Sequence, residues 1–65
     1  METYDYKVRR KDYDKESEYY YALFKQAKNN AAKASRNENP ERIKEFQDEA
    51  KKYSLKYMQL RKVNK

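Results

Sequence analysis

One short segment, Asn37-Glu38-Asn39-Pro40-Glu41, contains the only proline of the chain, and the chain has no glycine at all. Pro40 suits the first turn of a helix, because its missing N–H has no acceptor there and its φ angle is already helical. Asn39 is a good N-cap residue, and the proline that follows keeps it out of the helical region. We therefore expect one helix to end before this segment and a second helix to begin at Pro40.

Apolar and small residues recur at steps of three and four on both sides of this break. They are Tyr13, Ser17, Tyr20, Phe24, Ala27, Ala31 and Ala34 before it, and Ile43, Phe46, Ala50, Tyr53, Tyr57 and Leu60 after it. Such steps place side chains in a row along one face of a helix, as in a coiled coil. The sequence predicts a helix over residues 12–36, a loop over 37–39 and a helix over 40–63. The predicted fold class is an all-α antiparallel two-helix hairpin, formed by residues 12–65.

The two rows also predict which side chains face each other across the hairpin. The expected pairs are Ala34–Ile43, Ala31–Phe46, Ala27–Ala50, Phe24–Tyr53, Tyr20–Tyr57 and Ser17–Leu60, whose residue numbers each add to 77. Small residues then face large ones near the loop, and aromatic residues face each other at the open end. Both helices begin with acidic residues and end with basic ones, which places Asp14 and Arg61 at facing positions.

A two-helix hairpin has only one row of internal contacts, so the ordering entropy of the chain offsets most of what its core contributes. We therefore expect a second copy or a larger protein partner to complete the core. The candidate partner-binding residues are the apolar side chains outside the two rows. They are Tyr19, Tyr21, Leu23, Leu55 and Met58. The alternative is that these are isolated surface hydrophobes, which are common in proteins.

Residues 1–11 do not continue the helical pattern. Tyr4, Tyr6 and Val8 alternate with polar residues, as in a short strand. Because a single strand without a partner is not stable, we expect a frayed N-terminal arm. The alternative is an arm that becomes ordered on a partner, for example by adding to a sheet edge.

The excess of basic residues gives a second candidate surface, since the formal net charge is +6. The residues concerned precede the first helix or end the second, and we expect them to meet at the open end of the hairpin. They are Lys7, Arg9, Arg10, Lys11, Lys56, Arg61, Lys62 and Lys65. With tyrosines nearby, such a cluster can bind phosphates and stack a base. A solvated basic surface is the alternative.

Several kinds of chemistry are excluded by absent residue types. Without His or Cys there is no ordinary zinc or copper site and no Ser–His or Cys–His pair. Without Gly there is no P-loop and no dinucleotide fingerprint. We therefore expect no enzymatic activity, catalytic residue, cofactor, metal or small-molecule substrate. No stretch is apolar enough to cross a membrane and no signal peptide is recognisable, so we expect a complete, cytoplasmic protein without a membrane partner.

Two distant resemblances bear on function. Residues 28–33, 37–40 and 44–53 resemble helical hairpins at the end of some phage minor capsid proteins, and the long basic hairpin is similar in architecture to a ribosomal protein of the large subunit. Neither resemblance assigns a role to a residue. The abundance of Lys, Asn, Tyr and Glu is typical of AT-rich genomes, such as those of low-GC bacteria and their phages. We expect a non-enzymatic interaction protein, such as a regulator, inhibitor or assembly factor of a phage or mobile element. The alternative is a basic RNA- or DNA-binding module, for instance one associated with the ribosome.

Overall fold

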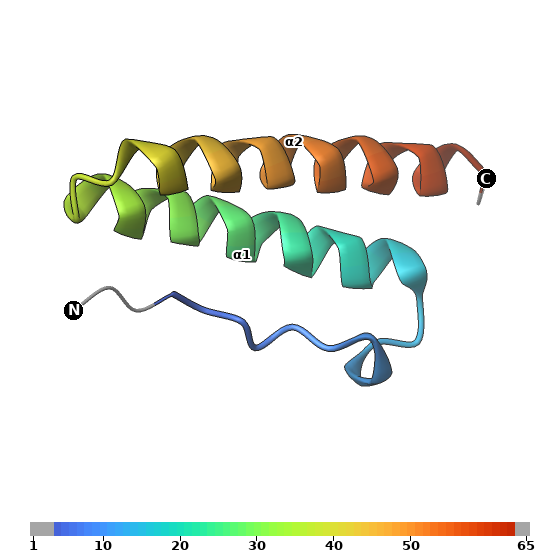
Figure 1. Cartoon of the computed structure of the whole chain (residues 1–65). Coiled ribbons are helices and arrows are strands. Elements are labelled where there is room, and N and C mark those ends of the chain that lie inside the picture. The colour runs from blue at the N-terminus through green and yellow to red at the C-terminus, as the bar shows by residue number, and fades with distance from the viewer. Residues whose placement is uncertain (1–3, 64–65) are drawn as a thin grey trace.

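The computed structural model describes residues 4–63 and forms an antiparallel helical hairpin with an extended arm. The helices are α1 (Glu16–Arg36) and α2 (Pro40–Val63), preceded by a short 3-10 helix, η1 (Arg10–Asp12). Figure 1 shows that the arm runs back along α1 on the side opposite α2. No strand occurs within residues 4–63, so the all-α hairpin is confirmed, and α2 has the expected bounds.

The loop joins the two helices through a continuous set of backbone hydrogen bonds. The N–H groups of Glu38 and Asn39 donate to the carbonyl oxygens of Ser35 (3.1 Å) and Ala34 (3.0 Å). Glu38 takes the left-handed conformation with φ of 55°. The side-chain oxygen of Asn39 accepts from the N–H of Arg42 at 3.2 Å, as expected of an N-cap residue. One loop residue, Asn39, thus ends α1 and begins α2.

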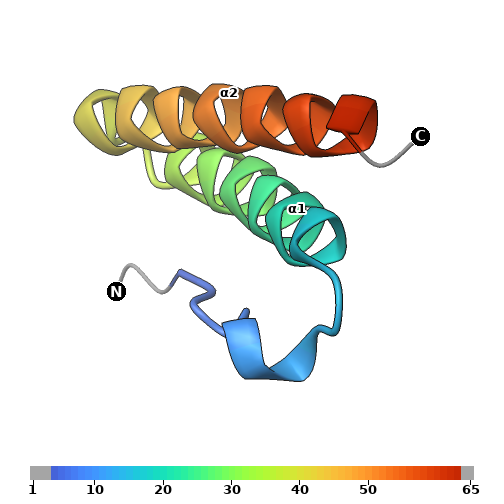
Figure 2. The ribbon, with the colours of Figure 1, turned by 90° about the vertical axis from the view of Figure 1, so that its right-hand side faces the viewer.

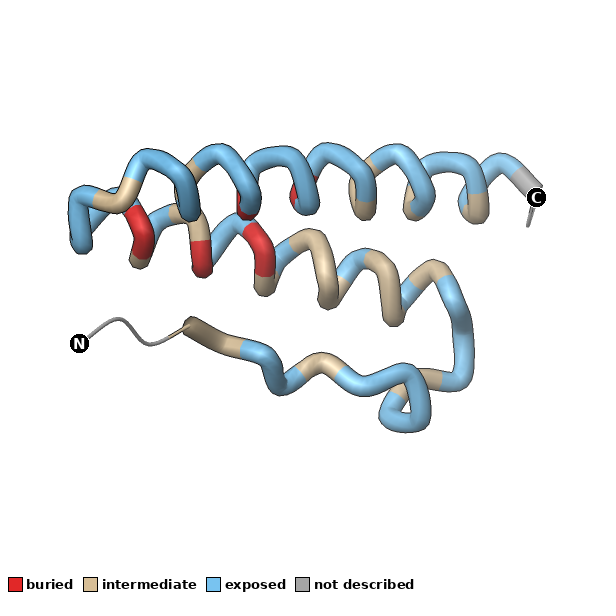
Figure 3. The backbone as a smooth tube through the Cα atoms, in the orientation of Figure 1, coloured by how far each residue is buried: buried red, intermediate tan, exposed pale blue. Residues whose placement is uncertain are grey.

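The hairpin core lies in the half of the molecule next to the loop. The buried apolar residues are Ala27, Ala34, Phe46 and Ala50, and Figure 3 shows them grouped towards the loop end. The six row residues predicted on α2 are all buried or half-buried, whereas the other described side chains of α2 are exposed except that of Ser54. The predicted row on α2 is therefore confirmed.

The register predicted at the open end is wrong. Tyr20 lies against Tyr53, with ring centroids 6.2 Å apart, and Tyr21 lies against Tyr57 at 5.1 Å. The two helices diverge towards this end in both views of the ribbon (Figures 1 and 2). Alanines allow the helices to approach near the loop, but tyrosine rings are too large to fit between helices at that spacing. The Tyr20–Tyr53 pair therefore lies on one side of the helix interface, and the Tyr21–Tyr57 pair lies on the other.

The facing charges at the open end do not form an ion pair. Within residues 4–63, ion pairs join Lys33 to Asp5 and Arg42 to Glu45, both at 2.9 Å. Arg61 instead lies over the ring of Tyr57, 5.7 Å from its centroid. Since the helices diverge here, a pair with Asp14 would require two long side chains to be ordered for a small gain.

The first helix begins at Glu16, four residues after the expected start at residue 12. Tyr13 is extended, with φ of −130° and ψ of 130°, and Lys15 is extended as well. A turn holds this conformation, because the Tyr13 N–H donates to the Arg10 carbonyl oxygen (3.1 Å) and the Arg10 guanidinium donates to the Tyr13 carbonyl oxygen (2.6 Å). This turn reverses the chain and directs the arm back along α1.

Candidate functional site

The arm is held on α1 by side-chain amides, and the expectation of a frayed arm is wrong for residues 4–11. The N–H of Asp5 donates to Oδ1 of Asn30 (2.7 Å), and Nδ2 of Asn30 donates to the carbonyl oxygen of Asp5 (2.8 Å). The N–H groups of Lys7 and Val8 donate to Oε1 of Gln26 at 2.8 and 3.1 Å. These amides offer the arm the donors and acceptors that a neighbouring strand would supply. An extended segment can therefore be stable here without a sheet.

Among these contacts, the amide of Asn30 carries the most weight. Its residue is 1 % exposed, so both of its hydrogen bonds to the arm are shielded from water, and each contributes about 0.5–1.5 kcal/mol. The ion pair between Lys33 and Asp5 is short at 2.9 Å, but both side chains are more than a third exposed. Exposed pairs contribute little. We therefore attribute the placement of the arm mainly to Asn30.

Aromatic contacts fix both ends of the arm. At one end the ring of Tyr4 reaches Phe46 on α2, with centroids 4.9 Å apart. At the other end, the guanidinium of Arg10 lies 5.9 Å from the ring centroid of Tyr19. The ring of Tyr13 packs against the same tyrosine at 6.2 Å. The arm thus spans α1 from its first turns to the loop-end core.

The hydrogen bond from Lys33 lowers the pKa of the Asp5 carboxyl below its usual 3.8, and nearby positive charge adds to the effect. Because the folded pKa is below the unfolded one, the contact stabilises the arm above pH 3.8 and is lost as the pH falls through the folded value. An NMR titration of the Asp5 carboxyl should therefore have its midpoint below 3.8. Lys33→Met should raise the midpoint, because it removes the largest cause of the lowered pKa, whereas Lys44→Met on α2 should leave it in place. A midpoint unaffected by Lys33→Met would contradict this contact.

The open end of the hairpin carries a surface in which tyrosine rings and cations alternate. Tyr21 and Tyr57 stack at 5.1 Å, Lys25 lies 5.3 Å from the centroid of Tyr21, and Arg61 covers Tyr57. Lys28 lies 5.3 Å from the ring centroid of Phe24, which itself packs against Tyr21 at 6.4 Å. Met58 lines the same hollow, whose volume is about 330 Å³. We call Tyr21, Phe24, Tyr57 and Met58, with Lys25, Lys28 and Arg61, the aromatic–cationic face.

The aromatic–cationic face exposes apolar area that a small protein ordinarily buries. Tyr21 is 46 % exposed and Met58 is 55 % exposed, although both lie beside the helix interface. A second hollow, of about 340 Å³, continues past Tyr21 to Ser17, Glu18 and Lys25. The divergence of the helices opens both hollows, so this surface follows directly from the size of the tyrosines.

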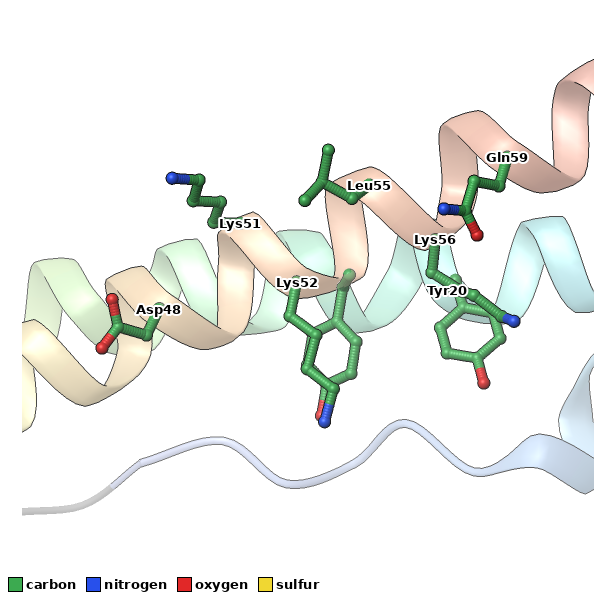
Figure 4. Close-up of a pocket in the computed structure, with 8 residues that line it drawn as sticks. Tyr20, Asp48, Lys51, Lys52, Leu55, Lys56 and Gln59 are labelled. Atoms are coloured by element: carbon green, nitrogen blue, oxygen red, sulfur yellow. The ribbon is translucent and has the colours of Figure 1, made fainter.

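A groove of about 600 Å³ lies on the other side of the hairpin. It is lined by Tyr20, Asp48, Lys51, Lys52, Tyr53, Leu55, Lys56 and Gln59 (Figure 4). Leu55 is 53 % exposed, but in Figure 4 it points away from Tyr20. Burial, followed by the charge of Glu49, raises the pKa of Tyr53 above its usual 10.0, so this phenol is neutral at physiological pH. Lysines surround this groove, and its apolar side chains do not gather into one patch.

The five predicted partner-binding residues are divided among three surfaces. Tyr21 and Met58 lie together on the aromatic–cationic face, and Leu55, about one helical turn before Met58, lines the groove. Tyr19 contacts Arg10, Tyr13 and Tyr20, and half-buried Leu23 lies on the helical face between Tyr19 and Gln26 that the arm covers. The structure therefore brings together two of the five.

The predicted basic cluster is also divided. Arg9, Arg10 and Lys11 lie at η1, on the side of α1 opposite α2 (Figure 1). Lys7 lies further along the arm, where its backbone N–H donates a hydrogen bond to Oε1 of Gln26. Lys56, Arg61 and Lys62 are on α2, with Lys56 at the groove and Arg61 on the aromatic–cationic face. Lys65 lies outside the described residues. The body of α1 thus separates the two groups of cations.

Gln26, Asn30 and Lys33, which hold the arm, were absent from the predicted sites, although the sequence contains a signal for them. Positions 19, 23, 26, 30 and 33 form a second row on α1 at steps of four and three. Its members change from apolar to amide and lysine, which obscures it in a search for apolar periodicity. Phe24 and Tyr57 were assigned to the core row, and Lys25 and Lys28 to the basic end of the first helix. They became part of a surface because the helices diverge.

No protein-family model, curated protein or solved structure matches this chain. No group of three or more acidic side chains within residues 4–63 is arranged to hold a metal ion. In the same part of the chain, neither helix is long and apolar enough to cross a membrane. The surfaces described above are therefore the basis for assigning a function.

Proposed function

We propose that this protein is a small non-enzymatic interaction protein that binds a larger protein through its aromatic–cationic face. The observation that carries the proposal is the exposed pair Tyr21 and Met58 beside the stacked Tyr57, ringed by Lys25, Lys28 and Arg61. Aromatic, Met and Arg side chains are the types enriched at protein interfaces. The proposal assigns no catalytic step to this face, because it gathers cations and phenols and no paired carboxylates.

Charge favours a different protein over a second copy as the occupant. Two copies meeting through this face would bring two sets of Lys25, Lys28 and Arg61 together, and like charges across an interface oppose binding. A partner with an apolar centre and an acidic rim would match the tyrosines and the cations at once. We propose a role as a cytoplasmic regulator, inhibitor or assembly factor, since such a small chain contributes a binding surface and little else.

The proposal can be tested with single substitutions on α2. Met58→Asp should weaken binding to the partner by about tenfold or more, because it places a charge at the centre of the apolar patch. Gln47→Asp, an equal charge change at another exposed α2 position, should leave the affinity unchanged. The partner would be captured from the source cell with wild-type protein, identified by mass spectrometry, and its affinity for each variant measured with purified components. Equal affinity for wild type and Met58→Asp would refute the assignment of this face.

Nucleic-acid binding is the second candidate, favoured by the alternation of cations and tyrosines on the same face. Against it, Arg61 and Lys25 already lie over the faces of Tyr57 and Tyr21 on which bases would stack. Binding to a single-stranded oligonucleotide would decide the matter, because phosphate contacts weaken steeply with salt. A salt-sensitive complex lost on joint neutralisation of Lys25, Lys28 and Arg61 would favour this function over the first.

A further inference from the structure

The side of α1 that holds the arm binds it mostly through hydrogen bonds to backbone atoms of the arm. Asn30 pairs with both the N–H and the carbonyl oxygen of Asp5, and Gln26 accepts from two successive N–H groups. Such contacts are available to any extended segment, whatever its side chains. Sequence selectivity comes from two places, the ring of Tyr4 on Phe46 and the carboxylate of Asp5 on Lys33.

The protein's own arm is an imperfect occupant of this site. The hydroxyl of Tyr4 is buried and has no hydrogen-bond partner within the described residues. A buried hydroxyl without a partner opposes binding, since it gives up its bonds to water. A phenylalanine at this position would keep the contact with Phe46 and remove that penalty. A segment from another protein could therefore bind here better than the arm does, residue for residue.

We infer that the side of α1 formed by Gln26, Asn30 and Lys33 is a binding site for an extended peptide segment of a partner. In the preferred segment, phenylalanine directly precedes aspartate. The protein's own arm fills the site until such a segment displaces it. The arm is tethered beside the site and so competes at a high effective concentration, which restricts binding to segments that fit better. This site is separate from the aromatic–cationic face and does not depend on the function proposed for it.

The extended residues between η1 and α1 allow the exchange without unfolding of the hairpin. Tyr13 and Lys15 are already in the extended region, and Lys15 makes no side-chain cap bond at the start of α1. Backbone rotation at these positions can move the arm away while α1 and α2 remain paired. Departure of the arm exposes the buried amide of Asn30, which a backbone supplied in trans would satisfy again.

The test uses the full chain and a fluorescent peptide with the sequence of residues 4–11 carrying Tyr4→Phe. A variant with Tyr4→Ala and Asp5→Ala in its own arm should bind this peptide about tenfold or more tighter than wild type, by fluorescence anisotropy. Adding Gln26→Ala to that variant should abolish the gain, whereas Asp5→Asn in the peptide should weaken binding by no more than about fivefold, as expected for an exposed ion pair. Adding Met58→Asp should change nothing, which separates this site from the aromatic–cationic face.

A second measurement covers the case in which the arm variant loses its helical content by circular dichroism. With saturating peptide, NMR spectra of the wild-type chain should show arm residues moving to random-coil positions while the side-chain amide of Asn30 stays protected. Equal binding by wild type and a folded arm variant, or no binding to that variant, would overturn the inference. So would arm resonances of the wild-type chain that are unchanged at saturating peptide.

Discussion

Replacing Phe46 with alanine should lower the free energy of unfolding by roughly 3–5 kcal/mol, the usual cost of truncating a buried aromatic side chain. Phe46 is 3 % exposed, and the other buried apolar residues within residues 4–63 are alanines. Its ring also supports Tyr4, so its loss opens the contact that ends the arm. A domain of this size has only a few kcal/mol of stability in total. The variant should therefore be mostly unfolded at 25 °C.

Urea and thermal unfolding followed by circular dichroism would measure this effect. Phe46→Leu keeps an apolar side chain of intermediate volume and should lose clearly less stability than Phe46→Ala. Leu55 is 53 % exposed, so Leu55→Ala should change the free energy of unfolding by no more than about 0.5 kcal/mol. If Phe46→Ala unfolded at the same urea concentration as wild type, the core would lie elsewhere.

Local signals explain why the hairpin was predictable. Proline after asparagine in a chain without glycine leaves one position for a break, and α2 begins at Pro40 as expected. The row of Ile43, Phe46 and Ala50 repeats at helical steps, so the buried face of α2 follows from spacing alone. These features depend on neighbours within a few residues, which the sequence displays directly.

The arm and the aromatic–cationic face were less predictable because both depend on three-dimensional fit. Whether Gln26 and Asn30 are solvated amides or partners for a backbone depends on a segment more than fifteen residues away. The alternation of Tyr4, Tyr6 and Val8 indicated an extended chain correctly, but not what it would pack against. Likewise, a prediction from coiled-coil spacing assumes a constant distance between the helices. The rings of Tyr20 and Tyr57 are too large for that distance, so the helices diverge.

Inserting one residue into the loop should disrupt the hairpin, because Asn39 bonds to both helices. This residue donates its N–H to the carbonyl of Ala34, accepts from the N–H of Arg42 through its side chain, and accepts from the N–H of Ile43 through its carbonyl, all at 3.0–3.2 Å. An alanine inserted between Glu38 and Asn39 cannot leave the same residue in both roles. If the hydrogen bond to the Ala34 carbonyl forms as before, the inserted alanine donates it and takes the place of Asn39 at the end of α1. If Asn39 keeps its N-cap bond to Arg42, it loses the bond to Ala34.

Either outcome also turns or shifts α2 against α1. One residue corresponds to about 100° of helical rotation and 1.5 Å of rise, which is enough to move Phe46 out of the core. Loss of the cap costs about 1 kcal/mol by itself, and misplacement of the core adds more. At roughly 4–8 °C per kcal/mol, the melting temperature should fall by about 10 °C or more.

Two controls separate register from simple loop damage. Glu38→Gly keeps the loop length and removes a side chain from a left-handed residue, so its melting temperature should equal or exceed that of wild type. An alanine inserted between Asp14 and Lys15 lengthens the other connection, and it should disturb the arm while leaving the cooperative melting of the hairpin in place. A loop insertion that melted at the wild-type temperature would mean that the helices find their register without the loop. The packing of the buried faces of α1 and α2 would then be sufficient to align them.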